Sequence, residues 1–343
     1  MRNPGTATSN VTIFEVAAQA GVSYGTVSRV LNNDPHVKTE TRERVNRVIQ
    51  DLGYVVNRQA RSLAGGKTHI IGMLVPDLGT GYIGEIIQGI DSELQLSGYD
   101  LMLYTTHRTP VLEADYVANL AQGMVDGLIL VLPRNPRDYI DILNSRHFPF
   151  VLIDHQGWGN ECPAVSATNW QGAFNATEYL IQLGHKRIGI ITGWMDLDSA
   201  IDRLEGYKAA LWTHHIPFSE ELVRESTFQQ LDGYKSAMEL LTLPNPPTAI
   251  FASNDVMAFG AMDAVRETGQ RIPEDISVIG FDDIPQAGAI HPALTTVRQP
   301  LRNMGSVAAQ MLLDLLKHPD IPSKRIELPT GLVIRDSCQP PRS

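Results

Sequence analysis

The stretch VTIFEVAAQAGVSYGTVSRVLN, residues 11–32, decides how the start of this 343-residue chain folds. Its small and apolar residues follow the spacing of a helix-turn-helix: Val16, Ala17, Ala20, Gly21, Val22, Val27 and Val30. Ala17 is small enough to let two helices approach each other, and Gly21 can adopt the left-handed backbone of a tight turn. The spacing therefore predicts helices over residues 13–20 and 24–31, with the second lying across the first.

A third short helix is expected over residues 39–52. Thr39 and Glu43 offer capping chemistry at its start, and Gly53 ends it. Because residues 11–56 contain no strand-like run, we expect residues 1–56 to form an all-helical headpiece, followed by a linker over residues 57–68.

The second helix would expose a polar side formed by Ser23, Tyr24, Gly25, Thr26, Ser28, Arg29 and Asn32. These residues combine donors and acceptors that suit DNA base edges with groups that suit phosphates. An arbitrary three-helix cap is the alternative interpretation. Residues 21–25 also match G-x-S-x-G, but a nucleophile elbow needs a strand before its serine. Since a helix precedes Ser23, this serine is not expected to be catalytic.

The charge of the chain is divided unevenly. The whole sequence carries a net charge of −10, which by itself argues against nucleic acid as a partner. Residues 1–68, however, hold nine Lys and Arg against five Asp and Glu, a net charge of +4, which leaves −14 for the rest. This asymmetry predicts a basic module for a polyanion and an acidic body with another task.

Short apolar runs rich in Ile, Val and Leu alternate with amphipathic stretches from residue 69 onward. The runs cover residues 69–76, 100–105, 127–133, 149–154, 187–192, 248–253 and 276–281, and the helical patterns cover 82–96, 170–183, 200–212, 255–268 and 301–316. Strands alternating with helices of this length indicate βαβ units and buried parallel sheets. Seven candidate strands favour two sheets over one.

Several classes of protein are disfavoured by the residue types present. Cys162 and Cys338 are the only cysteines, and the histidines, including His185, lack metal-ligand spacing. Residues 79–84 fit G-x-G-x-x-G, yet Tyr104, Thr105 and Thr106 stand where a dinucleotide fold needs a ribose-binding acid. We expect no enzyme, cofactor or metal. No apolar run of about 18 residues is present, and the polar start lacks a signal sequence, so we expect no membrane partner and a cytoplasmic location.

Polar side chains at the carboxyl ends of the predicted strands are the candidates for a ligand site, because ligands of open α/β sheets bind there. They are Asp77, Asp154, Trp194, Asn254, Asp255, Asp282 and Asp283. Carboxylates and amides suit a hydroxyl-rich ligand, whose ring faces Tyr82, Trp158 or Trp194 could cover. Asp255 and Asp283 are more typical of a helix cap or a strand-end turn.

The headpiece resembles that of the lactose-repressor/galactose-repressor family of bacterial transcription regulators. The resemblance lies in residues 11–17, 21–23, 26–32, 41–45 and 52–54 and extends over almost the whole chain. It implies that the second helix enters the major groove with Tyr24, Gly25 and Arg29 setting specificity, and that Tyr54 contributes to DNA binding. It also implies a hinge helix with Asn57, Arg61 and Leu63, in which Leu63 wedges into the minor groove. So short a helix is marginal in water, so we expect it to order only on DNA.

The same resemblance implies a body of two Rossmann-like lobes, folded like periplasmic sugar-binding proteins. Lobe 1 would cover about residues 69–166 and 298–325, and lobe 2 about residues 167–297 and 326–343, with residues 294–300 as a return to the first lobe. Arg203, Asn254, Asp282 and Asp154 match the family's effector-contacting positions; with Tyr82 and Trp194 they form the expected effector site.

The residues and the family resemblance together predict a homodimeric transcriptional regulator, a repressor with an activator as the alternative, that binds double-stranded DNA at a palindromic operator and is controlled by a small-molecule effector. A sugar or glycoside is expected, because the cleft candidates lack the cationic surplus that a phosphate would need; a nucleobase is the second class. The alternatives are a sugar-binding protein without a transcriptional role and an NAD-dependent dehydrogenase. The tail, residues 338–343, has no heptad pattern for a higher assembly.

Overall fold

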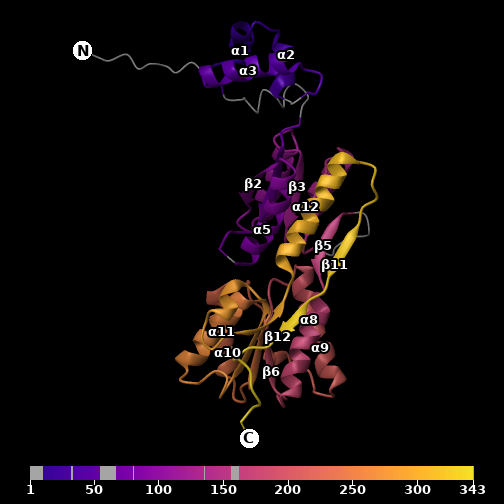
Figure 1. The fold of residues 1–343 in the computed structure, drawn as a ribbon. Coiled ribbons are helices and arrows are strands. Elements are labelled where there is room, and N and C mark those ends of the chain that lie inside the picture. Colours follow the sequence, from indigo (N-terminus) through magenta and orange to yellow (C-terminus); the bar gives the residue numbers. More distant parts are fainter. Residues whose placement is uncertain are drawn as a thin grey trace, which may run out of the picture. The chain divides into compact units, whose positions relative to one another are not determined.

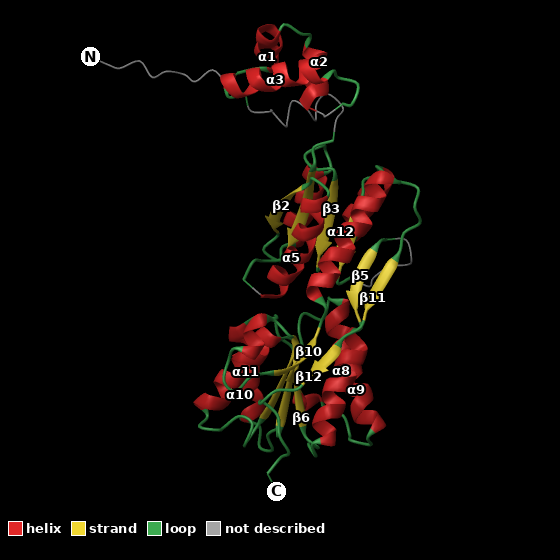
Figure 2. Ribbon diagram, in the orientation of Figure 1, coloured by secondary structure: helices red, strands yellow, loops and turns green. Residues whose placement is uncertain are grey.

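Short helices make up the first of two units into which the chain divides, Met1–Thr68 and His69–Ser343. The structure, a computed structural model, describes residues 11–31, 34–54, 67–79, 81–134, 136–155 and 162–342. Its elements are drawn along the chain in Figure 1 and by type in Figure 2.

The headpiece helices are α1 (Ile13–Ala20), α2 (Tyr24–Leu31) and α3 (Thr39–Leu52), as the sequence predicts. Gly21 has a φ of 63° and ends α1, so the left-handed turn is confirmed. Val16 and Val27 are fully buried in the small core between the helices. Gly53 ends α3 with a φ of 61°.

The cap expected at the start of α3 was wrong. Lys38 occupies the N-cap position without a side-chain hydrogen bond, and Thr39 lies inside the helix. Capping chemistry occurs instead at α1, where the Thr12 N–H donates to Glu15 Oε2 (2.6 Å) and the Glu15 N–H donates to Thr12 Oγ1 (3.4 Å). This reciprocal pair satisfies two N–H groups that the helix itself leaves without partners.

Six parallel strands form the sheet of lobe 1, in the order β11-β5-β4-β3-β1-β2. They are β1 (Ile70–Val75), β2 (Asp100–Thr105), β3 (Gly127–Val131), β4 (Phe150–Ile153), β5 (Ala164–Ala167) and β11 (Arg325–Leu328). The helices α5 (Gly81–Leu96) and α12 (Leu301–Lys317) cover one face, and α6 (Pro110–Leu120) and α7 (Arg137–Ser145) cover the other.

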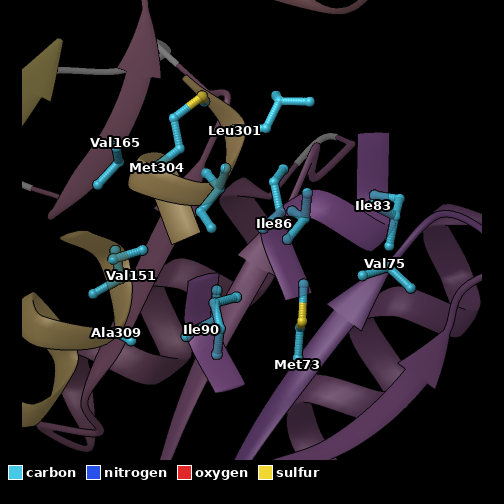
Figure 3. Packing of buried hydrophobic residues seen from close by; sticks show 14 of the residues in the cluster. Met73, Val75, Ile83, Ile86, Ile90, Val151, Val165, Leu301, Met304 and Ala309 are labelled. Atoms are coloured by element: carbon cyan, nitrogen blue, oxygen red, sulfur yellow. The ribbon is translucent and has the colours of Figure 1, made fainter. Parts of the chain in front are cut away.

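The core of lobe 1 lies between its sheet and the helices α5 and α12. Figure 3 shows this packing with residues of β1, α5 and α12 side by side: Met73, Val75, Ile83, Ile86, Ile90, Met304 and Ala309. The two helices touch at glycines; a Cβ at Gly89 would lie 2.0 Å from the Arg302 carbonyl oxygen. Close packing here fixes the start of α5, which lies at the carboxyl ends of the strands.

Lobe 2 has a second six-stranded sheet, in the order β12-β10-β9-β8-β6-β7. Its strands are β6 (Ile188–Ile191), β7 (Val223–Arg224), β8 (Ala249–Ala252), β9 (Ser277–Asp282), β10 (Thr295–Arg298) and β12 (Gly331–Val333). All pair in parallel except β12, which runs antiparallel to β10.

The helices of lobe 2 also cover both faces of their sheet (Figure 2). α8 (Asn169–Gln182) and α9 (Asp198–Thr213) lie on one face, and α10 (Gln230–Leu241) and α11 (Asp255–Glu267) on the other. Two short 3-10 turns, η1 (Glu220–Leu222) and η2 (Pro285–Gly288), complete the lobe. The predicted fold class is confirmed. Among the described residues, no helix is long and apolar enough to cross a bilayer.

The chain passes between the lobes three times: after β5, after β10 and after β11. The crossing expected at about residue 325 lies slightly later, because all of Arg325–Leu328 pairs with β5 of the first sheet. Likewise Ala167 ends β5 in lobe 1 and Arg298 ends β10 in lobe 2. Boundaries drawn from sequence miss these residues because the short strands β5, β10 and β11, at or next to a sheet edge, leave a weak apolar pattern.

Candidate functional site

The exposed side of α2 forms the first candidate site. Val27 and Val30 bury the opposite side of the helix, while Tyr24 remains 56% exposed and Arg29 is exposed. Ser23 Oγ accepts from the Thr26 N–H (3.2 Å) and so caps the start of α2. The polar residues 23–26, 28 and 29 therefore lie at the start and on the accessible side of one short helix.

Tyr24 has an aromatic neighbour that the sequence reasoning did not single out. The ring of Phe14, on α1, lies 5.6 Å from that of Tyr24, and Phe14 is 66% exposed. Tyr54 is partly buried against the headpiece core. Asn32, Asn57, Arg61 and Leu63, together with Trp158 of the body, lie outside the described residues.

A cavity between the lobes forms the second candidate site. Its walls come from both lobes, mainly from loops after the strands and from the first two turns of α5 and α9: Pro76, Asp77, Tyr82, Ile83, Arg108, Leu132, Asp154, Ser199, Arg203, Phe228, Asn254 and Asp282. This is the edge at which open α/β sheets bind ligands.

A chain of hydrogen bonds links the two walls of the cavity. Tyr82, on α5, donates its hydroxyl to Asp154 Oδ2 (3.3 Å), and Asn169 Nδ2 donates to Asp154 Oδ1 (3.3 Å). Arg203 of lobe 2 then donates from Nε to Asn169 Oδ1 (2.9 Å). The guanidinium of Arg203 also lies 3.9 Å from the ring centre of Phe281, which holds it flat. These fixed polar groups can orient the hydroxyl groups of a ligand.

Asp282 is the most perturbed carboxyl group of the cavity wall. It ends β9 with a φ of 115°, accepts from Gln299 Nε2 (2.7 Å) and has Arg203 Nη2 at 3.9 Å. Burial raises the pKa of Asp282 to about 7, although Arg203 and Gln299 act in the opposite direction. A carboxyl with this pKa can accept or donate a hydrogen bond near neutral pH.

Backbone strain is concentrated in the same place. Five non-glycine residues of the cavity wall have a φ between 49° and 115°: Arg108, Leu132, Asp154, Phe228 and Asp282. L-residues adopt this region rarely, and such residues cluster at functional sites, where the surrounding fold supports their strain. The strained backbone therefore marks the cavity as a candidate binding site.

Comparison with known proteins identifies both units. Residues 12–57 match the family model "Bacterial regulatory proteins, lacI family", and residues 177–338 match "Periplasmic binding protein-like domain". The probable transcriptional repressor ExuR of Bacillus subtilis is 36% identical over 334 residues, 96% of this chain and 98% of that protein. The chain belongs to the LacI family. The predicted resemblance is confirmed.

Solved structures of transcriptional regulators match nearly the whole chain. A lac repressor dimer bound to operator and an anti-inducer has a TM-score of 0.85 at 31% identity and covers 96% of this chain and 100% of its own. The complex of the regulator CelR with cellobiose has a TM-score of 0.74 at 32% identity, over 95% and 99% of the two chains.

Five of the six effector residues expected for this LacI-family chain line the cavity: Tyr82, Asp154, Arg203, Asn254 and Asp282. Asn254 has a structural task as well, because its Oδ1 accepts from the Met257 N–H (2.8 Å) and caps α11. Trp194 does not line this cavity: its Nε1 donates to the Thr227 carbonyl (2.9 Å), and Arg134 covers its ring.

The cavity wall also includes residues that are absent from the expected effector set. Arg108 follows β2, and the strand-end rule applied to that strand would have found it. Phe228 follows β7, which has only two residues and gives no sequence signal. Asp255 lies outside the cavity wall, fully buried, and accepts from Thr296 Oγ1 (2.5 Å) and the Ile284 N–H (2.9 Å). Within the described residues, no group of His, Cys, Asp and Glu could hold a metal ion.

Proposed function

We propose that this LacI-family chain is a transcriptional repressor that binds a palindromic operator as a homodimer and whose operator affinity changes when a small molecule occupies the cleft. One observation carries the proposal: a single chain combines an exposed polar helix of a helix-turn-helix with a strained, polar cavity between two lobes. Neither feature alone would couple DNA binding to a ligand. Action on DNA implies a cytoplasmic location.

The operator contacts are assigned to the start and exposed side of α2 and to the residues that follow the headpiece. Tyr24, Gly25 and Arg29 would read base edges, with Ser23, Thr26 and Ser28 on phosphates or neighbouring edges. Tyr54, Asn32, Asn57, Arg61 and Leu63 complete the proposed set. The charge of +4 on residues 1–68 supports this division, since the body carries −14 and would be repelled by phosphates.

The effector is proposed to be a carbohydrate. Three carboxyl groups of the wall, Asp77, Asp154 and Asp282, face two guanidinium groups, Arg108 and Arg203, so the cleft lacks a cationic surplus for a phosphate. Arg108 is itself paired with Asp77, Nη2 to Oδ2 2.6 Å. Carboxylates and guanidiniums accept and donate to neighbouring hydroxyls, while Phe228 and Leu132 provide apolar wall for a ring face. The relative CelR was solved with cellobiose, which agrees with this class.

A two-step titration tests the function. An operator is first selected from random DNA with the full-length protein, and its binding is then followed by fluorescence anisotropy with and without a panel of mono- and disaccharides. We expect specific binding whose logarithm falls linearly with the logarithm of salt concentration, and a change in affinity with one sugar. Binding that shows no sequence preference and no salt slope would refute the proposal.

Two neighbouring carboxylates provide a matched control for the cleft. Asp282→Asn should abolish the response to the active sugar, because Asp282 lies in the cavity wall. Asp283→Asn should retain it, since Asp283 lies outside that wall and pairs with Arg298 (2.7 Å) and Arg335 (2.6 Å). Equal responses of both variants would remove Asp282 from the effector site.

A further inference from the structure

Outside the cavity wall, Arg134 is one of the side chains that join the two lobes directly; His155 and Asp198 also meet between the lobes (3.5 Å). Arg134 follows β3 of lobe 1, and Asp196 follows β6 of lobe 2. The Nε of Arg134 donates to Asp196 Oδ2 (2.8 Å). The second amino group, Nη2, bonds the same oxygen. The guanidinium also lies over the ring of Trp194, 4.5 Å from its centroid. Arg134 therefore meets lobe 2 through a charge pair and a cation–π contact together.

This contact lies far from the crossings between the lobes. The crossings between the lobes leave from β5, β10 and β11, which lie at one side of the two sheets. β3 lies two places from β5 in the first sheet, and β6 lies three places from β10 in the second. When one lobe rotates relative to the other about the crossings, residues far from the crossings move further than residues close to them. A bond between them opposes opening more effectively than one close to the crossings.

Both partners are held in position by their own lobes. The backbone N–H of Arg134 donates to Glu113 Oε2 (3.5 Å), and the hydroxyl of Tyr139 donates to the other oxygen of this buried carboxyl. Trp194 is fixed by its bond from Nε1 to the Thr227 carbonyl oxygen (2.9 Å). Partners that are ordered in advance lose little conformational entropy when they meet, unlike most surface ion pairs.

We propose that Arg134, Trp194 and Asp196 form a clasp that holds the two lobes closed and sets how readily the cleft opens. The clasp lies outside the cavity wall. It rests on the proposed function only in that the cleft is taken as the effector site. Breaking the clasp shifts the body toward an open state, so that a ligand enters and leaves faster. The clasp thus tunes the response to the effector without contacting it.

Hydrogen exchange of the full-length protein, with no sugar or DNA added, tests the clasp. Asp196→Asn removes the charge and keeps the shape of the side chain. The readout is exchange at residues 81–84 and 255–256, which start α5 and α11 beside the cavity and whose N–H groups have no partner within their helices. We expect exchange there to rise about 3-fold to 10-fold, since each component of the clasp is individually weak.

The matched control is Glu221→Gln. It breaks the ion pair of Glu221 with Arg187 (2.6 Å) inside lobe 2, where the arginine is 22% exposed against 20% for Arg134. This variant should leave the cleft segments at wild-type exchange. Raising salt from about 0.05 M to about 0.5 M should speed exchange of these segments in the wild type and leave Asp196→Asn unchanged, because screening weakens the same charge pair.

Two results would overturn the proposal. One is wild-type exchange at residues 81–84 and 255–256 in Asp196→Asn, with any increase confined to the loops around Arg134 and Trp194; this would make the contact a local surface pair. The other is an equal increase in Glu221→Gln. Neither depends on operator or sugar binding, so failure of the clasp is distinguishable from failure of the proposed function.

Discussion

Arg29 is the residue of α2 best suited to read a base. Its side chain is exposed, and its Nε donates to the Gly25 carbonyl (3.3 Å), which ties it to its own helix. Arg29→Lys keeps the charge but loses the planar fork that binds two atoms of a guanine edge. We expect affinity for the selected operator to fall by about 1 to 3 kcal/mol, with unchanged affinity for random DNA. Anisotropy titrations on both DNAs measure this.

Arg29→Ala is the companion variant. It should lose the same discrimination and also reduce the salt slope by about one, because one cation is removed. If Arg29→Lys weakened binding to operator and random DNA equally, Arg29 would be a phosphate contact only.

Glu113 makes stability depend on pH. Burial raises its pKa from an ordinary value of 4.5 to about 7, although hydrogen bonds from Tyr139 and the Arg134 N–H lower it. Between these pH values the folded chain keeps a proton that the unfolded chain has lost. The free energy of unfolding therefore falls as pH rises from 4.5 to 7, by at most about 3 kcal/mol from this group.

Glu113→Gln tests this by urea unfolding at several pH values from 4.5 to 8. Glutamine stays neutral, so we expect a shallower fall than in the wild type. Asp282, whose pKa is also raised to about 7, still contributes a slope of the same sign. Glu220→Gln, at an exposed position, controls for the loss of one carboxylate and should leave the slope unchanged. A wild-type slope in Glu113→Gln would contradict the assignment.

Residues of the cleft were predictable where a strong sequence pattern preceded them. Asp154 and Asp282 lie at the ends of clear apolar runs, and Arg203 was identified by family resemblance; all three lie in the wall. Trp194 also follows such a run, but its side chain turns to Thr227. The end of a strand fixes the backbone position of the next residue and not the direction of its side chain. Phe228 was missed because the strand before it has two residues.

At the scale of elements, the turn of the helix-turn-helix depends on one glycine. Gly21 has a φ of 63°, whereas Gly25 lies within α2 with its nearest neighbour 4.0 Å from an added Cβ. Gly21→Ala should destabilise the headpiece by about 1 to 2 kcal/mol, because a side chain strains left-handed backbone. Gly25→Ala should stabilise α2 by about 0.5 to 1 kcal/mol.

Hydrogen exchange of α1 to α3 in the full chain measures both effects. Exchange should speed up in Gly21→Ala and slow down in Gly25→Ala, while the body is unchanged in each. The same direction of change in both variants would argue against a requirement for left-handed backbone at residue 21.

The elements that the sequence predicts well are those that carry a long periodic pattern. The three headpiece helices were predicted to the residue, and α5, α8, α11 and α12 to within one residue at each end. β5, β7, β10, β11 and β12 were missed, because each has only two to four residues and small or polar side chains interrupt its apolar run. Three of these missed strands, β5, β10 and β11, precede the three crossings between the lobes.

At the scale of the whole molecule, function requires a connection between headpiece and body. Residues 57–68 carry it in sequence, and Leu63 is the residue that family resemblance assigns to the minor groove. We expect Leu63→Ala to weaken operator binding by more than about tenfold, or about 1.4 kcal/mol. Binding of the active sugar, followed by calorimetry without DNA, should be unaffected. Unchanged operator affinity would remove Leu63 from the DNA interface.

The three crossings between the lobes have a mechanical consequence. Thr168 and Thr330, on the first and third crossings, are joined by hydrogen bonds of 2.9 Å, and Gln299 on the second holds Asp282 of the cleft wall. Parallel, cross-linked tethers resist sliding and twisting but permit bending about their common line. We therefore expect bending about this line to be the easiest motion of the body, so that a molecule in the cleft acts on the rest of the chain through the angle between the lobes.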